Sequence, residues 1–192
     1  MAFWNVEGSK DPKRNFRFKV MIEGLQGDEG LVWFAKKATK PNFTVAESKH
    51  SYLNHTYYWP GRVEWQTISV TFVDPVMVGG DQNNGTVQLL NKLMQESGYR
   101  PPDTQAALVT QSKANVASKL GFVQIVQIDA EGDPIEHWTL HNPFIKKISY
   151  GELDYENDDL TQIEVEFRYD YAICGTDNNV NPFFDAGVAG DQ

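Results

Sequence analysis

The sequence predicts a mainly β protein: a β-sandwich or open barrel of about seven or eight strands, with one flanking α-helix and a long oligomerisation hairpin. Three observations lead to this fold class. Short segments in which apolar and polar residues alternate recur along the 192 residues. Turns rich in Gly, Asn and Asp separate these segments. A clear helical stripe of apolar residues occurs in residues 86–97 alone.

Composition agrees with a single folded domain. Hydrophobic residues make up 41% of the chain, which is enough for a packed core. The 26 acidic and 17 basic side chains give a net charge of −9, which argues against binding nucleic acid through Lys and Arg. Cys174 is alone, so no intrachain disulfide is expected. We find no signal peptide and no apolar run of about 20 residues, and therefore expect a soluble protein made in the cytoplasm without membrane contact.

Residues 1–14 are polar and are expected to form an N-terminal arm ahead of a β domain over residues 15–174. Residues 16–22 predict a strand, because apolar side chains occupy every second position. After a turn at 24–30, residues 31–39 predict a second strand. The buried face of the first strand is expected to carry Phe16, Phe18, Val20 and Ile22.

Residues 43–59 predict a long hairpin with its turn at 51–54 and its end at Pro60-Gly61. This segment is rich in Thr, Ser, Tyr and His and has no strongly apolar face of its own. Such a hairpin exposes backbone edges and needs something to lie against, for which another subunit is a candidate. The residues expected at that subunit interface are Glu47, Lys49, Tyr52, Leu53, Tyr57, Tyr58 and Trp59.

Residues 65–73 alternate clearly and predict a half-buried strand. A helix is expected from Thr86, as N-cap, to Ser97, with Gly98 at its C-terminal cap. The segment 103–120 has a weak apolar stripe and predicts a partly helical connector.

The chain returns to β structure after Gly121. Residues 122–129 and 135–140 flank a turn signal and predict a hairpin. Further strands are expected at 144–153 and at 163–171, where alternation is clearest. Residues 175–192 are rich in Gly, Asn and Asp and are expected to form a C-terminal extension.

Catalytic, metal-binding and cofactor motifs are not found in the sequence. His137 and His141 straddle a strand end and do not share a helical face. The acidic segment 154–159 lacks the Gly and Glu that an EF-hand loop requires. The hairpin aromatics leave one binding alternative open, in which Tyr57, Tyr58 and Trp59 form a stacking platform of a monomeric β-sandwich carbohydrate-binding module.

The order of short motifs resembles the tail tube proteins of contractile-tailed bacteriophages over about residues 16–172. The N-terminal motifs are Lys37-Ala38-Thr39, the polar hairpin, Pro60-Gly61-Arg62 and the Trp-containing strand at 65–74. The C-terminal ones are Glu152-Leu153-Asp154-Tyr155, the acidic turn and the strand at 163–171. Residues 79–118 and the extension after Cys174 fit this pattern poorly.

This resemblance implies a fold shared with the haemolysin-coregulated proteins of type VI secretion and a structural role without enzymatic activity. It implies homo-hexameric rings that stack into a tube, with tail sheath and baseplate proteins as partners. Genome DNA would pass through the lumen without specific binding. The protein would be assembled in the host cytoplasm and would reside in the virion tail. A baseplate tube-initiator paralogue is the alternative within the same assembly.

The acidic residues of the strand at 163–171 receive a candidate role from this resemblance. Glu164, Glu166 and Asp170 alternate with the apolar positions and are expected on one face. If that face lines the lumen, repeated carboxylates would repel phosphates and keep DNA from adhering.

Overall fold

A computed structural model describes residues 12–25, 35–75, 85–102, 110–156 and 158–175 of the chain. Several expectations fall wholly or mostly outside these ranges: the arm at 1–11, the turn and strand start at 26–34, and the extension at 176–192.

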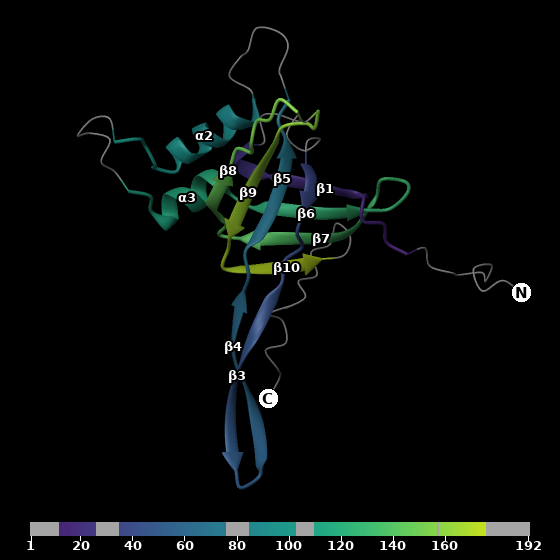
Figure 1. Ribbon diagram of the computed structural model, residues 1–192, viewed down its shortest axis with the longest axis vertical. Coiled ribbons are helices and arrows are strands. Elements are labelled where there is room, and N and C mark those ends of the chain that lie inside the picture. Colours follow the sequence, from purple (N-terminus) through teal and green to yellow (C-terminus); the bar gives the residue numbers. More distant parts are fainter. Residues whose placement is uncertain (1–11, 26–34, 76–84, 103–109, 157, 176–192) are drawn as a thin grey trace, which may run out of the picture.

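Two antiparallel four-stranded sheets form the body of the protein (Figure 1). The first has the order β1-β6-β7-β10, and the second has the order β2-β5-β9-β8. The strands of the first sheet are β1 (Phe18–Ile22), β6 (Val123–Ile128), β7 (Pro134–His141) and β10 (Tyr171–Gly175). Those of the second are β2 (Ala35–Ala38), β5 (Ile68–Val73), β9 (Gln162–Arg168) and β8 (Phe144–Ser149).

A third, two-stranded sheet projects from this body (Figure 1). It consists of β3 (Phe43–Tyr52) and β4 (His55–Trp65), which pair from Phe43↔Trp65 to Tyr52↔His55. The described part of the chain therefore has ten strands rather than seven or eight, and none of its three sheets closes into a barrel. The predicted β-sandwich with a long hairpin is confirmed.

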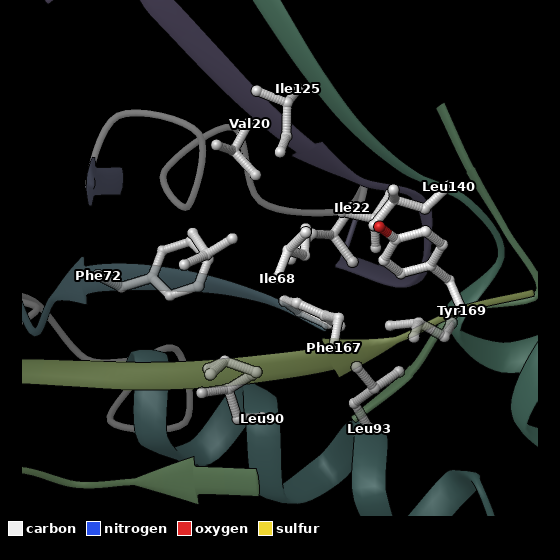
Figure 2. Close-up of a cluster of buried hydrophobic side chains, with 14 of the residues drawn as sticks. Val20, Ile22, Ile68, Phe72, Leu90, Leu93, Ile125, Leu140, Phe167 and Tyr169 are labelled. Carbon is white, nitrogen blue, oxygen red and sulfur yellow. The ribbon is translucent and has the colours of Figure 1, made fainter. Parts of the chain in front are cut away.

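Apolar side chains of the two sheets form one core between them (Figure 2). The alternation in β5 buries Ile68, Val70 and Phe72, as the sequence predicts. Their neighbours across the β5–β9 pairing, Phe167, Val165 and Ile163, are also fully buried. The first sheet contributes Val20, Ile22, Val123, Ile125, Leu140 and Ala172.

In the described ranges, two helices rather than one pack beside this core, near the short 3₁₀ turn η1 (Glu23–Leu25). Helix α2 (Thr86–Glu96) buries Leu90 and Leu93, and α3 (Lys113–Leu120) buries Leu120. The second helix lies in the segment where a partly helical connector is expected. Its first turn is capped by the Ser112 hydroxyl, which accepts a hydrogen bond from the Asn115 amide at 3.2 Å.

The predicted C-terminal cap of α2 is confirmed, but its predicted N-cap is wrong. Gly85, not Thr86, is the N-cap, because the backbone is still extended at Gly85 and Thr86 already lies buried in the first turn. At the other end Gly98 has a φ of +105°. The amides of Gly98 and Tyr99 donate to the carbonyls of Gln95 and Met94, which is a Schellman cap.

The expected end of the hairpin at Pro60-Gly61 is wrong, because β4 continues to Trp65. Val45 pairs with Val63 and Glu47 pairs with Pro60, so β4 has one extra residue there and forms a β-bulge. A proline is tolerated because each strand of a two-stranded sheet has a free edge. A Cβ at Gly61 would lie 2.9 Å from the Ala46 carbonyl oxygen, which explains the glycine.

The strand expected at 163–171 is in fact two strands in different sheets. β9 ends at Arg168, and the chain crosses through Tyr169 and Asp170 into β10. Tyr169 stays buried, whereas Tyr171 is exposed and does not belong to the buried face. A smaller difference occurs at the other end of the domain, where Phe16 precedes β1 and is exposed.

We expect Phe167→Ala to lower the free energy of unfolding by about 3–5 kcal/mol, because it would leave a cavity at a fully buried position between the sheets. Tyr155→Ala, at a fully exposed position outside the hairpin, is the control and should change it by no more than about 0.5 kcal/mol. Urea unfolding followed by fluorescence measures both. Equal effects of the two variants would contradict the described core.

Candidate functional site

The projecting hairpin is the candidate interaction surface. All ten residues of β3 are exposed, and so are all residues of β4 except Thr56 and Trp65 at intermediate exposure. Both faces of this sheet and much of its backbone edge therefore meet solvent. A hairpin in this state is marginal alone and presents a template for another chain.

The two faces of the hairpin differ in chemistry. Cross-strand pairs Ser48↔Trp59, His50↔Tyr57 and Tyr52↔His55 share one face. Their rings are close, with centroid distances of 6.3 Å for His50–Trp59, 6.2 Å for Tyr57–Trp59 and 4.8 Å for His55–Tyr57.

The opposite face carries Glu47, Lys49 and Tyr58. The seven residues predicted for the interface thus lie together on the hairpin, three on each face, with Leu53 in the turn between the strands. Because Tyr58 points away from Tyr57 and Trp59, these three aromatic residues do not form one stacking platform.

The root of the hairpin is fixed to the sandwich by rings and by an ion pair. Trp65 lies between Phe43 and Tyr169, at centroid distances of 5.0 and 5.9 Å. The Arg168 guanidinium donates to the Glu64 carboxylate at 3.2 Å, which joins β9 to β4. These contacts hold the point where the hairpin leaves the body.

Glu136 forms a second anchor of the hairpin, which the sequence did not predict. Its side chain is 12% exposed and accepts hydrogen bonds from Lys13, from Lys40 at 2.6 Å and from the Trp138 indole N–H at 2.6 Å. Lys40 stands just ahead of β3, so the carboxylate links the hairpin to β7. The available signal was the spacing in β7, which places Glu136 on the same side as the buried Leu140.

The electrostatics of Glu136 follow from these partners. Burial acts to raise its pKa, but the hydrogen bonds from Lys13, Lys40 and Trp138 outweigh this effect and lower the pKa from 4.5 to about 2. The carboxylate is therefore ionised in the folded protein at every pH above that value.

Two of the three predicted lumen residues are neighbours in the structure, and the third is not. Glu164 and Glu166 lie on the outer face of β9, beside a hollow of about 290 Å³ that Lys147, Thr39, Thr67 and Ser69 also line. Asp170 lies in the connection between β9 and β10. There it accepts hydrogen bonds from Lys113 at 2.6 Å and from Asn142 at 2.9 Å.

Lysines accompany the glutamates on that outer face. Lys146 forms an ion pair with Glu166 at 2.9 Å, and Lys147 stands opposite Glu166 in the β8–β9 register. Hydrogen bonds from Thr67 and Lys146 lower the pKa of Glu166, and the bond from Lys113 does the same for the pKa of Asp170. The face is thus of mixed charge rather than acidic.

Other chemistry finds little support in the part of the chain that the structure describes. No group of three or more His, Cys, Asp or Glu side chains there is arranged to hold a metal ion. His141 stacks on Tyr171 with ring centroids 4.6 Å apart, and burial lowers the pKa of this histidine. Within the described helices, none has the length and apolar character to cross a membrane.

We expect Glu136→Gln to reduce the free energy of unfolding at neutral pH by about 2 kcal/mol, since the ionised carboxylate is stabilised in the folded state. Because the folded pKa lies below the unfolded one, this contribution is complete above pH 4.5 and disappears as pH falls towards 2. The difference between the native protein and the variant should therefore narrow over that range. Urea unfolding at a series of pH values measures it.

Glu131→Gln, the same change in an exposed turn, is the matched control and should have little effect. A loss from Glu136→Gln that stays constant from pH 7 to about pH 2 would contradict the assigned role of the carboxylate.

Comparison with known proteins identifies solved structures with a similar fold. No family model and no curated protein matches the sequence. Among solved structures, a chain of the anti-feeding prophage baseplate is similar with a TM-score of 0.56 at 13% identity, covering 86% of this chain and 97% of that one. A chain of the anti-feeding prophage tube-terminating cap has a TM-score of 0.56 at 15% identity, covering 92% and 99%.

A third similar chain belongs to the PVC sheath/tube terminator of an extracellular contractile injection system. Its TM-score is 0.55 at 13% identity, with 87% of this chain and 99% of that one covered. The alignments cover 97–99% of those chains and 86–92% of this one. The chain therefore shares its fold with these chains of contractile systems, as its sequence motifs predict.

Proposed function

We propose that this chain is the structural subunit of a phage tail tube, in which six copies close into a ring and rings stack into a tube. The observation that carries this proposal is the hairpin, which is exposed on both faces yet firmly anchored at its root. A long unpaired sheet in a monomer exposes strand edges that promote aggregation, and pairing with neighbouring copies covers these edges.

Contacts between different surfaces of identical copies close into rings when the rotation permits. The interface residues would be those of the hairpin, with the aromatic face of Tyr52, Tyr57 and Trp59 as its most apolar part. Aromatic residues of this kind are common at the energetic centres of interfaces. Assembly in the host cytoplasm, followed by incorporation into a virion tail with sheath and baseplate proteins, completes the proposal.

The channel wall would be the outer face of the sheet β2-β5-β9-β8, with Glu164 and Glu166 facing the lumen. Genome DNA would pass along this wall without specific binding. Because Lys146 and Lys147 stand among the glutamates, the wall would repel phosphates less strongly than a purely acidic one. We leave Asp170 out of this wall, since it lies in the connection after β9 and is bound to Lys113.

A tube-initiator in the baseplate is the second candidate. It is favoured by the fact that one similar chain belongs to a baseplate structure. Copy number separates the two candidates, because a tube subunit is among the most abundant proteins of a particle, whereas an initiator forms a single ring.

Negative-stain electron microscopy of the purified protein over a range of concentrations tests the proposal. Six-fold rings or tubes are the expected result. A monomer that persists at the highest concentration would overturn it.

We expect Trp59→Lys and Tyr58→Lys to fold normally but to raise the concentration needed for assembly by at least about tenfold, because each would bury a charge in an interface. Trp59→Phe and Tyr58→Phe are the matched controls and should assemble. Circular dichroism checks folding and electron microscopy checks assembly. Normal assembly of both Lys variants would argue against a hairpin interface.

We expect Glu164→Lys to leave tubes intact and to slow genome release several-fold, since replacing six carboxylates per ring by six ammonium groups would attract phosphates. Glu164→Gln should have a much smaller effect. Release kinetics from assembled particles, at low and high salt, measure the difference. Identical kinetics for the two variants would exclude Glu164 from the channel wall.

A further inference from the structure

Two polar side chains, those of Gln127 and Glu136, lie together at one end of the core. They stand opposite each other in the β6–β7 register and face the same side as the core residue Ile125. Gln127 is only 7% exposed although its side chain is an amide. A buried polar group is costly unless it is hydrogen-bonded, so the partners of this pair indicate what it does.

The N-terminal segment, residues 13–17, is bound by this pair. The Lys13 ammonium forms an ion pair with the Glu136 carboxylate, and the Gln127 amide group donates to the Arg14 carbonyl at 3.3 Å. The carbonyl of the last residue of the segment accepts a hydrogen bond from the amide of the last residue of β6, at 3.1 Å. The segment is therefore held against the end of β6, just ahead of β1 (Figure 1).

The start of the hairpin is bound by the same two side chains. The Lys40 ammonium donates to the Gln127 side-chain oxygen at 2.8 Å and to a Glu136 carboxylate oxygen at 2.6 Å. Only two residues separate Lys40 from β3, and the carbonyl of the second, Asn42, accepts a hydrogen bond from the Gln66 amide at 2.9 Å. A fixed Lys40 therefore helps to fix the position at which the hairpin leaves the body.

The two lysines support each other more than they compete. Lys13 contacts the Oε2 atom of Glu136, whereas Lys40 and the Trp138 indole contact Oε1. When one oxygen is held, the carboxylate loses rotational freedom and the other oxygen stays directed at its own donors. Repulsion between the two ammonium groups opposes this effect only weakly, because the lysine side chains are about half exposed, at 51% and 47%.

We propose that the Gln127–Glu136 pair couples the N-terminal segment to the hairpin: docking of residues 13–17 orients the two acceptors for Lys40 and thereby stiffens the root of β3. The pair positions both elements from outside, since its two residues belong to β6 and β7. A subunit with its segment docked holds the hairpin in one direction, ready for pairing, and a subunit with its segment released holds it less firmly. Only this consequence for assembly rests on the proposed tube function, because the coupling is a property of the single chain.

Hydrogen exchange of backbone amides, measured by mass spectrometry on protein diluted until it is monomeric, tests the coupling. Lys13→Met removes the ammonium group and keeps an unbranched side chain. Exchange at residues 43–47 of the hairpin root should become at least about threefold faster, because an oriented carboxylate no longer opposes local opening there. Lys13→Arg keeps the positive charge and should exchange like the native protein. Lys19→Met, the same change at an exposed position of β1, is the matched control and should also leave the root unchanged.

The reverse effect is the second test, because an energetic coupling between two sites acts equally in both directions. Lys40→Met should accelerate exchange at residues 14–18 by a factor similar to that of Lys13→Met at the hairpin root. Lys37→Met, at an exposed position of β2, is the control for this direction and should leave the N-terminal segment unchanged.

A distance measurement reports the direction of the hairpin itself. Spin labels are attached at Leu53→Cys, in the hairpin turn, and at Glu131→Cys, in the exposed turn between β6 and β7, together with Cys174→Ala to remove the native thiol. Lys13→Met should broaden the distribution of distances between the two labels, whereas Lys19→Met should not.

The outcomes separate the coupling from the tube function. Faster exchange confined to the mutated side, or faster by one factor throughout the chain including β5, would overturn the coupling and leave the tube function standing. An unchanged distance distribution in Lys13→Met would overturn it as well. A native protein that never assembles, yet shows the reciprocal exchange effects, would overturn the tube function and leave the coupling standing.

Discussion

A two-stranded sheet with solvent on both faces cannot hold itself in place, and this constraint shapes the rest of the molecule. The β-sandwich supplies the contacts that fix the root of the hairpin. Trp65 packs between Phe43 and Tyr169, and Arg168 joins β9 to Glu64. Since Arg168 lies in the core strand β9 and Tyr169 belongs to the core, a stable sandwich is the condition for a directed hairpin.

Much of the sandwich could be predicted from the sequence, because a two-residue alternation reports a half-buried strand directly. The alternation at 68–72 and 163–167 is of this kind. This prediction failed beyond Arg168, because Tyr169 and Tyr171 continue the two-residue alternation although the chain passes from one sheet into the other. Periodicity describes which side a residue faces and says nothing about which sheet it joins. The predicted end of the hairpin at Pro60-Gly61 was wrong for another reason. Each strand of a two-stranded sheet has a free edge, so a β-bulge there can accommodate both a proline and a glycine.

The candidate site was predicted as a segment but not as a set of contacts. The exposed hairpin follows from its own composition. The partners of the acidic residues do not, because Lys146 and Lys113 reach Glu166 and Asp170 only through the fold. A run of carboxylates in the sequence therefore overstated the negative charge of one face. Glu136 is different, since its position on an otherwise apolar side of β7 was a usable sign of a buried partner.

The direct passage of the chain from β4 into β5 has a mechanical consequence. Only Gln66 and Thr67 separate the two strands, and they run nearly in line (Figure 1). A pull on the hairpin therefore acts along β5, which is hydrogen-bonded on both sides to β2 and β9. Bonds perpendicular to the pull are loaded together in shear rather than opened one after another. The fold thereby passes tension applied along the hairpin into a strand that is paired on both sides.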